Sequence, residues 1–413
     1  MAPKKKTGLI GNPLGHSYSP EIHALLGDYR YDLFPMEEDE VGPFLKRGDF
    51  DALNVTIPYK KTVLPFLDRI SEEARRIGSV NTIVKQADGA LWGYNTDYDG
   101  FSRMLARRGI GLSGKKVVIL GSGGASVTVR AVAGDSGARK IAVISRSGED
   151  NYSNLEKHAD AEILVNTTPV GMYPNNGVSP VSLDRFPKLE AVADLIYNPA
   201  RTALILDAED RGIPAVSGLS MLVFQAARAS ELFTGIPVDD ARAEAVLSAV
   251  GKAKRNILLI GMPGSGKSTL GTLLAEKLGR RFADLDAEIV KAAGRPIPAI
   301  FAEDGEAVFR DYETAALREL SKQSSLVVAT GGGAVIREEN RRLFRENSSV
   351  LLLRRPLSSL AKDGRPLSAA HTAEELWNAR KKFYESAAEG SVEVSDDPCE
   401  TLSRALAWWA AQS

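Results

Sequence analysis

Short apolar runs alternate with amphipathic stretches along the chain. The runs at 52–57, 116–120 and 257–260 are rich in Val, Ile and Leu, which is typical of strands buried in a sheet. Between such runs the apolar residues recur at helical spacing, as they do from Met221 to Phe233. Strands that alternate with helices predict an α/β fold with parallel sheets.

The same pattern divides the chain into two domains. We expect residues 7–250 to form the first and residues 255–413 the second, with the polar segment 248–256 as a short linker because it interrupts the apolar pattern. Within the first domain, one lobe is expected over residues 7–97 and 218–250 and a second lobe over residues 98–217. The helix expected near residues 221–233 could pack on either lobe. A cleft between two such lobes is a common place for a small-molecule site.

The most informative motif opens the second domain. The segment Gly261-Met-Pro-Gly-Ser-Gly-Lys-Ser-Thr269 follows an apolar run and precedes a helical pattern. This is the context of a phosphate-binding loop, in which backbone N–H groups and a helix N-terminus converge on phosphate. Lys267 is expected to reach the β- and γ-phosphates of ATP, and Ser268 to bind Mg²⁺. A plain Gly-rich turn would leave this Lys-Ser pair unexplained. The expected nucleotide contacts are Gly264, Ser265, Gly266, Lys267, Ser268 and Thr269.

Charged residues and glycines follow the loop in an order that suits a kinase. Asp284 and Asp286 are expected on one side of a strand because side chains alternate with period two; Asp284 would lie near Mg²⁺ and Asp286 at a substrate hydroxyl. Arg310 and Glu313 are one helical turn apart, so Glu313 could hold the guanidinium for a substrate carboxylate. Each feature alone is more often structural, because such ion pairs are usually weak surface contacts and Gly331–Gly333 could be a plain turn.

The order of these motifs resembles that of shikimate kinase over residues 255–413. The resemblance rests on the loop at 261, Asp284-Leu-Asp286, Asp304-Gly-Glu306 with Phe309-Arg310, Gly331–Gly333, Arg365-Pro-Leu367 and Arg380. It implies that Asp286, Arg310, Gly332, Gly333 and Arg380 hold shikimate, that Lys267, Asp286 and Arg365 are catalytic, and that Ser268 and Asp284 serve Mg²⁺. The chain between the strand at 350–353 and Arg365 is shorter than in typical members, which makes Lys362 a candidate for the adenine-contacting position.

Polar residues also gather after the strands expected in the first domain. Ser17 and Ser19 precede a predicted helix, where two hydroxyls and the helix N-terminus could face a carboxylate; Ser19 could equally be a plain N-cap. A later strand ends in Thr56-Ile-Pro-Tyr-Lys60, and Asp97 follows a further apolar run. A lysine and an aspartate at one substrate hydroxyl form a suitable proton-transfer pair, although a lone lysine is usually solvated.

A second glycine motif, Gly121-Ser122-Gly123-Gly124-Ala125, follows the apolar run at 116–120 and is typical of a Rossmann-like lobe. The next expected strand ends in Ser145-Arg146-Ser147, with no Asp or Glu. A carboxylate at this point would bind the ribose 2′-hydroxyl of NAD, whereas an arginine accommodates the 2′-phosphate of NADP. The sequence therefore predicts NADP(H), with Ser145 and Arg146 among its contacts.

Together these segments resemble shikimate dehydrogenase over about residues 7–248. Further matching segments are Asn166-Thr-Thr-Pro-Val-Gly-Met172, Asp194-Leu-Ile-Tyr-Asn-Pro199 and Gly218-Leu-Ser-Met-Leu222 with Gln225. The resemblance implies that Lys60 and Asp97 are catalytic and that Ser17, Ser19, Thr56, Asn81 and Gln225 hold the substrate. Ala24 and Ser145 stand where many members have Asn. Only residues 147–165 separate Arg146 from Asn166, so the nucleotide lobe is trimmed.

The bulk composition argues against other classes of protein. A net charge of −1 gives no reason to expect nucleic acid or an anionic membrane as a partner, and no apolar run is long enough for a membrane span. A single cysteine, Cys399, excludes an internal disulfide, and the scattered histidines have no zinc-ligand spacing. The basic N-terminal segment lacks the apolar region of a secretory signal. We therefore expect a cytoplasmic protein whose partners are small-molecule substrates, with a homodimer as an open alternative.

The two resemblances are chemically consecutive. Reduction of 3-dehydroshikimate gives shikimate, and a shikimate kinase phosphorylates the new 3-hydroxyl. We therefore predict a bifunctional enzyme of aromatic amino-acid biosynthesis that uses NADP(H), ATP and Mg²⁺. The alternatives are a quinate/shikimate dehydrogenase, either with relaxed cofactor use or with a degenerate, regulatory kinase-like domain, and a binding protein without catalysis. The presence of Lys60 and Lys267 argues against the last of these.

Overall fold

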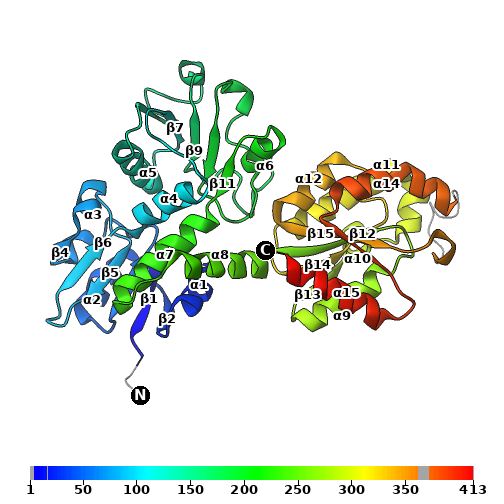
Figure 1. Ribbon diagram of the computed structural model, residues 1–413, viewed down its shortest axis with the longest axis horizontal. Helices are drawn as coiled ribbons and strands as arrows, with labels where there is room; N and C mark the ends of the chain where they lie inside the picture. The colour runs from blue at the N-terminus through cyan, green and yellow to red at the C-terminus, as the bar shows by residue number, and fades with distance from the viewer. Residues whose placement is uncertain (1–3, 16, 361–371, 413) are drawn as a thin grey trace. The chain divides into compact units, whose positions relative to one another are not determined.

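The computed structural model describes residues 4–15, 17–360 and 372–412 (Figure 1). The chain forms two compact units. The first consists of Met1–Tyr197 with Thr202–Val250, and the second of Asn198–Arg201 with Gly251–Ser413. Each unit has parallel strands flanked by helices, so the predicted α/β class is confirmed (Figure 1).

The first unit begins with a mixed sheet. Its strands are β1 (Lys6–Gly11), β2 (Arg30–Pro35), β3 (Ala52–Val55), β4 (Arg69–Ile70), β5 (Thr82–Lys85) and β6 (Leu91–Tyr94), in the order β2-β1-β3-β5-β6-β4. Strand β5 runs antiparallel to both β3 and β6, so the expectation of parallel sheets is wrong at this point. The short turn at residues 86–90 accounts for the β5–β6 pair, because only an antiparallel pair can be joined by so few residues. The helices of this lobe are α1 (Ser19–Leu26), α2 (Glu38–Arg47), η1 (Leu64–Phe66) and α3 (Glu72–Ile77).

A second sheet of the first unit is wholly parallel. It contains β7 (Lys116–Leu120), β8 (Lys140–Ile144), β9 (Ile163–Asn166), β10 (Ala191–Asp194) and β11 (Ala215–Ser217), in the order β11-β10-β9-β7-β8. Successive residues of β7 alternate between two cores, with Val117 and Ile119 in one and Val118 and Leu120 in the other. Such continuous burial explains the unbroken apolar run. The helices are α5 (Gly124–Asp135), η2 (Leu155–His158), η3 (Leu183–Arg185) and α6 (Ala203–Asp210).

Two helices join the lobes of the first unit. Helices α4 (Thr96–Arg107) and α7 (Leu219–Thr234) pack so closely that a Cβ at Gly100 would lie 2.7 Å from the carbonyl oxygen of Met221. Val223 and Ala227 of α7 pack with the residues of α1, whereas Met221 belongs to a core of the second lobe. The sequence did not decide which lobe this helix packs on, and in the structure α7 packs on both.

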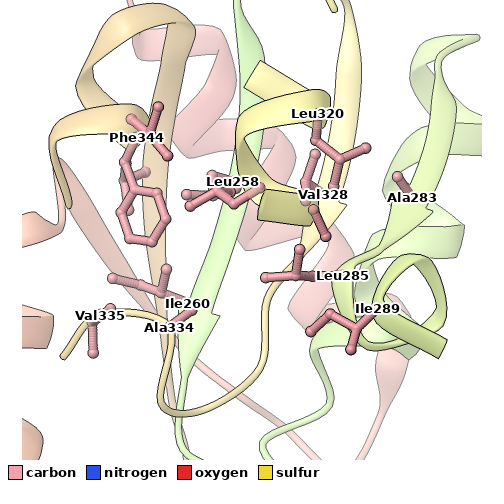
Figure 2. Close-up of a cluster of buried hydrophobic side chains, with 14 of the residues drawn as sticks. Leu258, Ile260, Ala283, Leu285, Ile289, Leu320, Val328, Ala334, Val335 and Phe344 are labelled. Carbon is pink, nitrogen blue, oxygen red and sulfur yellow. The ribbon is translucent and has the colours of Figure 1, made fainter. Parts of the chain in front are cut away.

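The second unit is built on another five-stranded parallel sheet. Its strands are β12 (Asn256–Gly261), β13 (Arg281–Asp284), β14 (Leu326–Ala329), β15 (Ser348–Arg354) and β16 (Gly390–Glu393), in the order β13-β14-β12-β15-β16. One face carries Leu258, Ile260 and Val328, which pack with Phe344 and with other helix residues (Figure 2). The helices are α9 (Lys267–Leu278), α10 (Leu285–Ala293), α11 (Ile297–Ser321), α12 (Glu338–Asn347), η4 (Leu357–Ser359), α14 (Ala373–Ala387) and α15 (Pro398–Ala411).

One of the two C-terminal tryptophans packs on the opposite face of this sheet. Trp409 is 6% exposed and packs with Ile257 and Leu259 of β12. The guanidinium carbon of Arg280 lies 4.7 Å from the centre of its ring, and the Lys252 ammonium lies 5.4 Å from it. Trp409 is therefore a core residue of the second unit.

The segment expected to link the domains is largely helical. Helix α8 runs from Asp240 to Lys254, and strand β12 begins at Asn256. The division between the units, at Val250 and Gly251, falls inside this helix. This boundary lies within the segment 248–256. The helix there was not expected from the pattern, because Ala, Lys and Ser tolerate a helix without an apolar stripe, and only a few side chains of α8 are buried.

The close approach of α4 and α7 makes a testable prediction. Replacing Gly100 with Ala should destabilise these helices by about 1–3 kcal/mol, because the new Cβ would meet backbone atoms of Met221 and Gln225 and the Gln225 Cβ, which cannot move aside without the helix. The matched control is Gly134→Ala in α5, where a Cβ meets nothing within 4 Å and a gain of about 0.5–1 kcal/mol is expected. Hydrogen exchange of peptides from α4 and α7 measures both effects. Equal protection in the two variants would contradict this close packing.

Candidate active sites

The first candidate site lies where β1 and β3 end. In parallel strands the carboxyl ends lie at the same edge, so the segments that follow them meet. The N–H of Thr56 donates to the carbonyl of Ile10 at 2.9 Å, and the Thr56 methyl lies directly beside Gly11, where a Cβ would clash with it. Ser17 and Ser19 follow β1, and the Ser17 hydroxyl accepts a 3.2 Å hydrogen bond from the N–H of Ser19. Tyr18, with no side-chain hydrogen bond to the cap, occupies the N-cap position of α1, so Ser19 is not the N-cap.

Lys60 and Asp97 meet in this region. The Lys60 Nζ lies 2.5 Å from Asp97 Oδ2, and their side chains are 25% and 14% exposed. Lys60 follows β3, and its carbonyl accepts a 2.9 Å hydrogen bond from the N–H of Val80. Asp97 lies in the first turn of α4, where the helix dipole favours a negative charge. The sequence suggested this pair from residue chemistry and from a resemblance; the structure places the two side chains in direct contact.

Two further predicted substrate residues support the turn that carries Asp97. Asn81 Oδ1 accepts a 2.7 Å hydrogen bond from the N–H of Thr96, and Asn81 Nδ2 donates to the Thr96 hydroxyl at 3.1 Å. The same hydroxyl donates to Gln225 Oε1 at 3.3 Å. Asn81 and Gln225 therefore converge on the residue before Asp97 and fix the start of α4.

A buried polar pair beneath this site was not predicted. Asn54 lies opposite Thr82 in the register of β3 and β5, and its Nδ2 donates to the Thr82 hydroxyl at 3.1 Å. Tyr31 donates to Asn54 Oδ1 at 2.8 Å, which satisfies the other end of the amide. The available signal was the presence of polar residues inside two apolar strands, but their pairing depends on a register that the sequence did not reveal.

The glycine motif of the second lobe forms an open helix N-terminus. Gly121 has a φ of 99°, and Gly123 is the N-cap of α5. A Cβ at Gly123 or Gly124 would meet nothing within 4 Å, and Ser122 is also exposed, so free space faces the first turn of α5. This geometry fits a pyrophosphate. Ala125 follows in the same turn, and Ser145 and the exposed Arg146 follow β8, the neighbouring strand.

The next two strands end in a buried carboxylate network. Asp194, at the end of β10, accepts hydrogen bonds from Asn166 Nδ2 at 3.0 Å, Thr202 Oγ1 at 2.7 Å and the N–H of Ile196 at 3.0 Å. Asn166 Oδ1 in turn accepts from the N–H and hydroxyl of Thr168. Burial raises the pKa of Asp194 to about 6, although the three hydrogen bonds oppose this shift. The network ties together the segments that follow β9 and β10.

The phosphate-binding loop of the second unit follows β12 as predicted. Gly264 and Gly266 have φ values of 76° and 91°, which suit glycine and turn the backbone around the loop. The ammonium of Lys267 is buried and donates to the carbonyls of Gly261 at 3.0 Å and Met262 at 2.9 Å. Ser265 is fully buried, whereas Ser268 and Thr269 are exposed in the first turn of α9. The open loop and its lysine fit the phosphates of a nucleotide.

Asp284 and Asp286 are placed differently from the prediction. Strand β13 ends at Asp284, and Asp286 already belongs to α10, so strand alternation does not put them on one side. Asp284 is instead the N-cap of α10, and its Oδ1 accepts a 3.0 Å hydrogen bond from the N–H of Asp286. Its Oδ2 accepts from the Ser268 hydroxyl at 2.6 Å. Ser268 and Asp284 are therefore paired at a position that suits a magnesium ion with water ligands and phosphate.

The predicted substrate arginine is held by two carboxylates. Arg310 donates to Glu313 at 2.8 Å and to Glu306 at 2.9 Å. Burial disfavours its charge, but the ion pairs outweigh burial and raise its pKa. Glu313 is 1% exposed, and burial raises its pKa against the attraction of Arg310. A Cβ at Gly333 would collide with the Arg310 guanidinium, and one at Gly331 would lie 3.0 Å from Asp286 Oδ1. Glycines thus let this backbone approach both groups.

Helix α14 completes this site. Arg380 Nη1 donates to the carbonyl of Gly332 at 3.2 Å, and the hydroxyl of Tyr384 donates to the same oxygen. Burial raises the pKa of Tyr384 to about 12, so the phenol remains a donor. Arg310, Gly332, Gly333 and Arg380 are therefore neighbours, as the resemblance implied. Arg365 and Lys362 lie outside the described residues.

Two further findings concern metal binding by the described residues and the length of their apolar helices. They contain no group of three or more His, Cys, Asp or Glu side chains arranged to hold a metal ion. Among the helices of the described part of the chain, none is both long and apolar enough to span a membrane.

Family models match both units, and the first unit is also similar to known proteins. The model for the shikimate dehydrogenase substrate-binding domain matches residues 9–83, the model for the shikimate 5′-dehydrogenase C-terminal domain matches residues 218–249, and the shikimate kinase model matches residues 263–408. The NADP(+) shikimate dehydrogenase of Clostridium perfringens strain 13 is 40% identical over 263 residues, which cover 59% of this chain and 97% of that protein. The chain belongs to the shikimate dehydrogenase family.

Solved structures agree with this assignment. The shikimate 5-dehydrogenase of Thermus thermophilus, in complex with NADP(H) and shikimate, has a TM-score of 0.54 and 33% identity, and the match covers 59% of this chain and 98% of that one. A chorismate mutase/shikimate 5-dehydrogenase fusion from Clostridium acetobutylicum has a TM-score of 0.57 and 36% identity, over 60% of this chain and 97% of that one. The prediction of an enzyme with a shikimate dehydrogenase of the NADP(+) class and a shikimate kinase domain is confirmed.

The pKa of Asp194 predicts how stability depends on pH. Its ordinary pKa is 3.8, so between pH 4 and pH 6 the folded protein binds a proton that the unfolded chain does not. The contribution of Asp194 to stability therefore rises as pH falls. Relative to Asp194→Asn, which does not titrate, the protein should gain about 1 kcal/mol between pH 7 and pH 5. Hydrogen exchange of β9 and β10 in both proteins at the two pH values measures this difference. If the stability difference between the two proteins did not change with pH, the pKa of Asp194 would lie below this pH range.

The packing of Gly333 on Arg310 gives a second prediction. Gly333→Ala should displace the guanidinium and raise the Kd for shikimate by about tenfold, equivalent to roughly 1.4 kcal/mol. The Kd for ATP in the same protein should change little, because the clash does not involve the phosphate-binding loop. ADP-release kinetics with shikimate and ATP varied in turn separate the two effects, because the first unit, whose proposed product is also shikimate, releases no ADP. Unchanged shikimate affinity would show that Arg310 does not hold this ligand.

Proposed function

We propose that this shikimate-pathway enzyme is bifunctional and catalyses two consecutive steps. It reduces 3-dehydroshikimate to shikimate with NADPH and then phosphorylates the 3-hydroxyl of shikimate with ATP and Mg²⁺. The observation that carries the proposal is that each unit holds its own reactive pair: Lys60 with Asp97 in the first, and Lys267 with the Ser268–Asp284 contact in the second.

Lys60 and Asp97 suit the reduction. Bound NADPH supplies a hydride to the carbonyl carbon. Lys60 donates a proton to the carbonyl oxygen, which becomes the 3-hydroxyl, and Asp97 orients this hydroxyl while it stabilises the ammonium at 2.5 Å. Ser17, Ser19, Thr56, Asn81 and Gln225 are the proposed substrate contacts around the pair. The nucleotide would be held by Gly121–Ala125 at the start of α5, with Ser145 and Arg146 at its 2′-phosphate.

The dehydrogenase fold alone does not select the substrate. The 5-ketofructose reductase of a Gluconobacter strain has a TM-score of 0.53 and 28% identity with this chain. Related folds therefore act on different carbonyl compounds, and the side chains must decide. The proposed serine and amide contacts would provide hydrogen bonds for a carboxylate and for hydroxyls, which is what 3-dehydroshikimate requires.

The second unit suits phosphoryl transfer to the product of the first. ATP supplies the phosphoryl group. Arg310 and Arg380 would bind the shikimate carboxylate, and Asp286 would accept a hydrogen bond from the attacking hydroxyl. Lys267, released from the carbonyls of Gly261 and Met262, would neutralise phosphate charge, while Ser268 and Asp284 serve Mg²⁺. Positioning and charge stabilisation then provide most of the rate enhancement.

Reciprocal variants test the two activities in one chain. Lys60→Ala should slow NADPH oxidation with 3-dehydroshikimate by about 100- to 10,000-fold and leave ADP release from added shikimate unchanged. Lys267→Ala should slow ADP release by at least about 100-fold and leave NADPH oxidation unchanged. Each variant is the control for the other. The unmodified protein should convert 3-dehydroshikimate to shikimate 3-phosphate when NADPH, ATP and Mg²⁺ are present.

The same assay also examines the alternative function. NADPH oxidation without ADP release, even with added shikimate, would overturn the kinase half of the proposal and favour a regulatory role for that unit. Oxidation of NADH as fast as NADPH, or faster turnover of quinate than of shikimate, would favour a dehydrogenase with relaxed specificity.

A further inference from the structure

The segment between β8 and β9 is supported in an unusual way. In a Rossmann-like lobe the crossover between parallel strands normally contains a helix. Here residues 145–162 contain only the short η2 helix, because the chain is trimmed. Side-chain amides stabilise the segment instead: Asn151 Nδ2 donates to the carbonyl of Gly148 at 3.1 Å, and Asn154 Nδ2 donates to that of Glu149 at 2.9 Å.

One pair connects this segment to the core. His158 Nε2 lies 2.9 Å from Asp150 Oδ1, and the histidine side chain is 3% exposed. This contact lowers the pKa of the Asp150 carboxyl. Leu155, in the same η2 helix as His158, is 2% exposed and belongs to a core of the nucleotide lobe. Asp150 is therefore fixed against a buried and well-packed residue.

Asp150 also holds the backbone at the end of β8. Its carbonyl accepts a 3.1 Å hydrogen bond from the N–H of Ser145, and Ser145 forms an isolated β-bridge with Asn151. Arg146 is the next residue and is exposed. Burial raises the pKa of Tyr152, whose ring packs on the core, and the charge of Arg146 opposes this rise. Arg146 directly follows Ser145, so its position depends on Asp150 and Asn151, which contact Ser145.

We infer that Asp150 and His158 are positioning residues for the 2′-phosphate of NADP, acting through Ser145 and Arg146. The inference rests on the proposed function of Arg146 as the 2′-phosphate contact. Without the pair, the backbone of Ser145 loses the support that a crossover helix would otherwise provide. Arg146 then samples more conformations and pays a larger entropic cost when it binds phosphate. The pair makes NADP preference possible in a trimmed lobe.

The binding of two adenosine ligands measures how the Asp150–His158 pair affects recognition of the 2′-phosphate, without enzyme turnover. Adenosine 2′,5′-bisphosphate and 5′-AMP differ only by the 2′-phosphate, and their affinities for the full chain can be measured by displacement of fluorescent NADPH. His158→Leu and the near-isosteric Asp150→Asn should each weaken the bisphosphate by about tenfold and 5′-AMP by less than about twofold. His158→Gln keeps a polar side chain toward Asp150 and should restore most of the bisphosphate affinity.

A matched control lies in the same segment. The ammonium of Lys116 contacts Asp160 and the carbonyl of Lys157, but neither contact involves Ser145 or Asp150. Asp160→Asn therefore removes an ion pair from this region and should leave the affinities for both ligands unchanged. A general loosening of the lobe would instead weaken both ligands in every variant.

The outcomes separate this inference from the function on which it rests. If Arg146→Gln leaves the bisphosphate affinity unchanged, the proposed 2′-phosphate contact is wrong and the inference falls with it. If Arg146→Gln weakens the bisphosphate but His158→Leu and Asp150→Asn do not, the contact stands and the positioning role is overturned. Equal weakening of both ligands by His158→Leu also overturns it, because that result shows only structural support.

Discussion

The carboxyl edge of each parallel sheet determines where chemistry can occur in this chain. Loops after parallel strands open at one edge, next to the N-termini of the following helices, where N–H groups lack partners within the helix. Gly121–Ala125 follows β7, the phosphate-binding loop follows β12, and Gly331–Gly333 follows β14. Lys60 follows β3 in the mixed sheet, so it too lies after the carboxyl end of a strand. Anionic groups on the proposed ligands would meet these positions without additional buried charge.

The Lys60–Asp97 pair and the Arg310–Glu313 pair use charge differently. Lys60 and Asp97 are partly exposed, so water can reach the pair and, in the proposed reaction, would replace the proton after each turnover. Arg310 and Glu313 are buried, and an ion pair that is removed from water needs good geometry to offset desolvation. Two carboxylates on one guanidinium provide that geometry. The first pair suits proton transfer, whereas the second suits fixed binding of a carboxylate.

Local spacing predicted much of the fold and part of the candidate sites. The phosphate-binding loop and the Arg310–Glu313 contact depend on residues close in sequence, and both are present as expected. Predictions failed where an element ended or the chain reversed earlier than its apolar pattern indicated. Asp284 ends a strand and caps a helix, so the alternation rule did not extend to Asp286.

Contacts between distant residues were beyond the reach of sequence patterns. The Asn54–Thr82 pair requires the register of β3 and β5, and the Asp150–His158 pair requires the path of a segment without a helix. Neither residue pair has a characteristic spacing. The roles implied for Arg365 and Lys362 stay predictions, because these residues lie outside the described part of the chain.

Separate cores make the two proposed activities independently testable. Each cluster of buried apolar side chains lies within one unit: the clusters around Leu258 and Leu259 contain residues of the second unit alone, and those around Val117 and Ile22 contain residues of the first. A substitution in one core therefore changes a cluster that contains residues of that unit alone. If Lys60→Ala nevertheless lowered kinase activity, the cause would have to be shikimate supply or a ligand-dependent coupling. Added shikimate distinguishes these two causes, because it restores supply but leaves a coupling between the units in place.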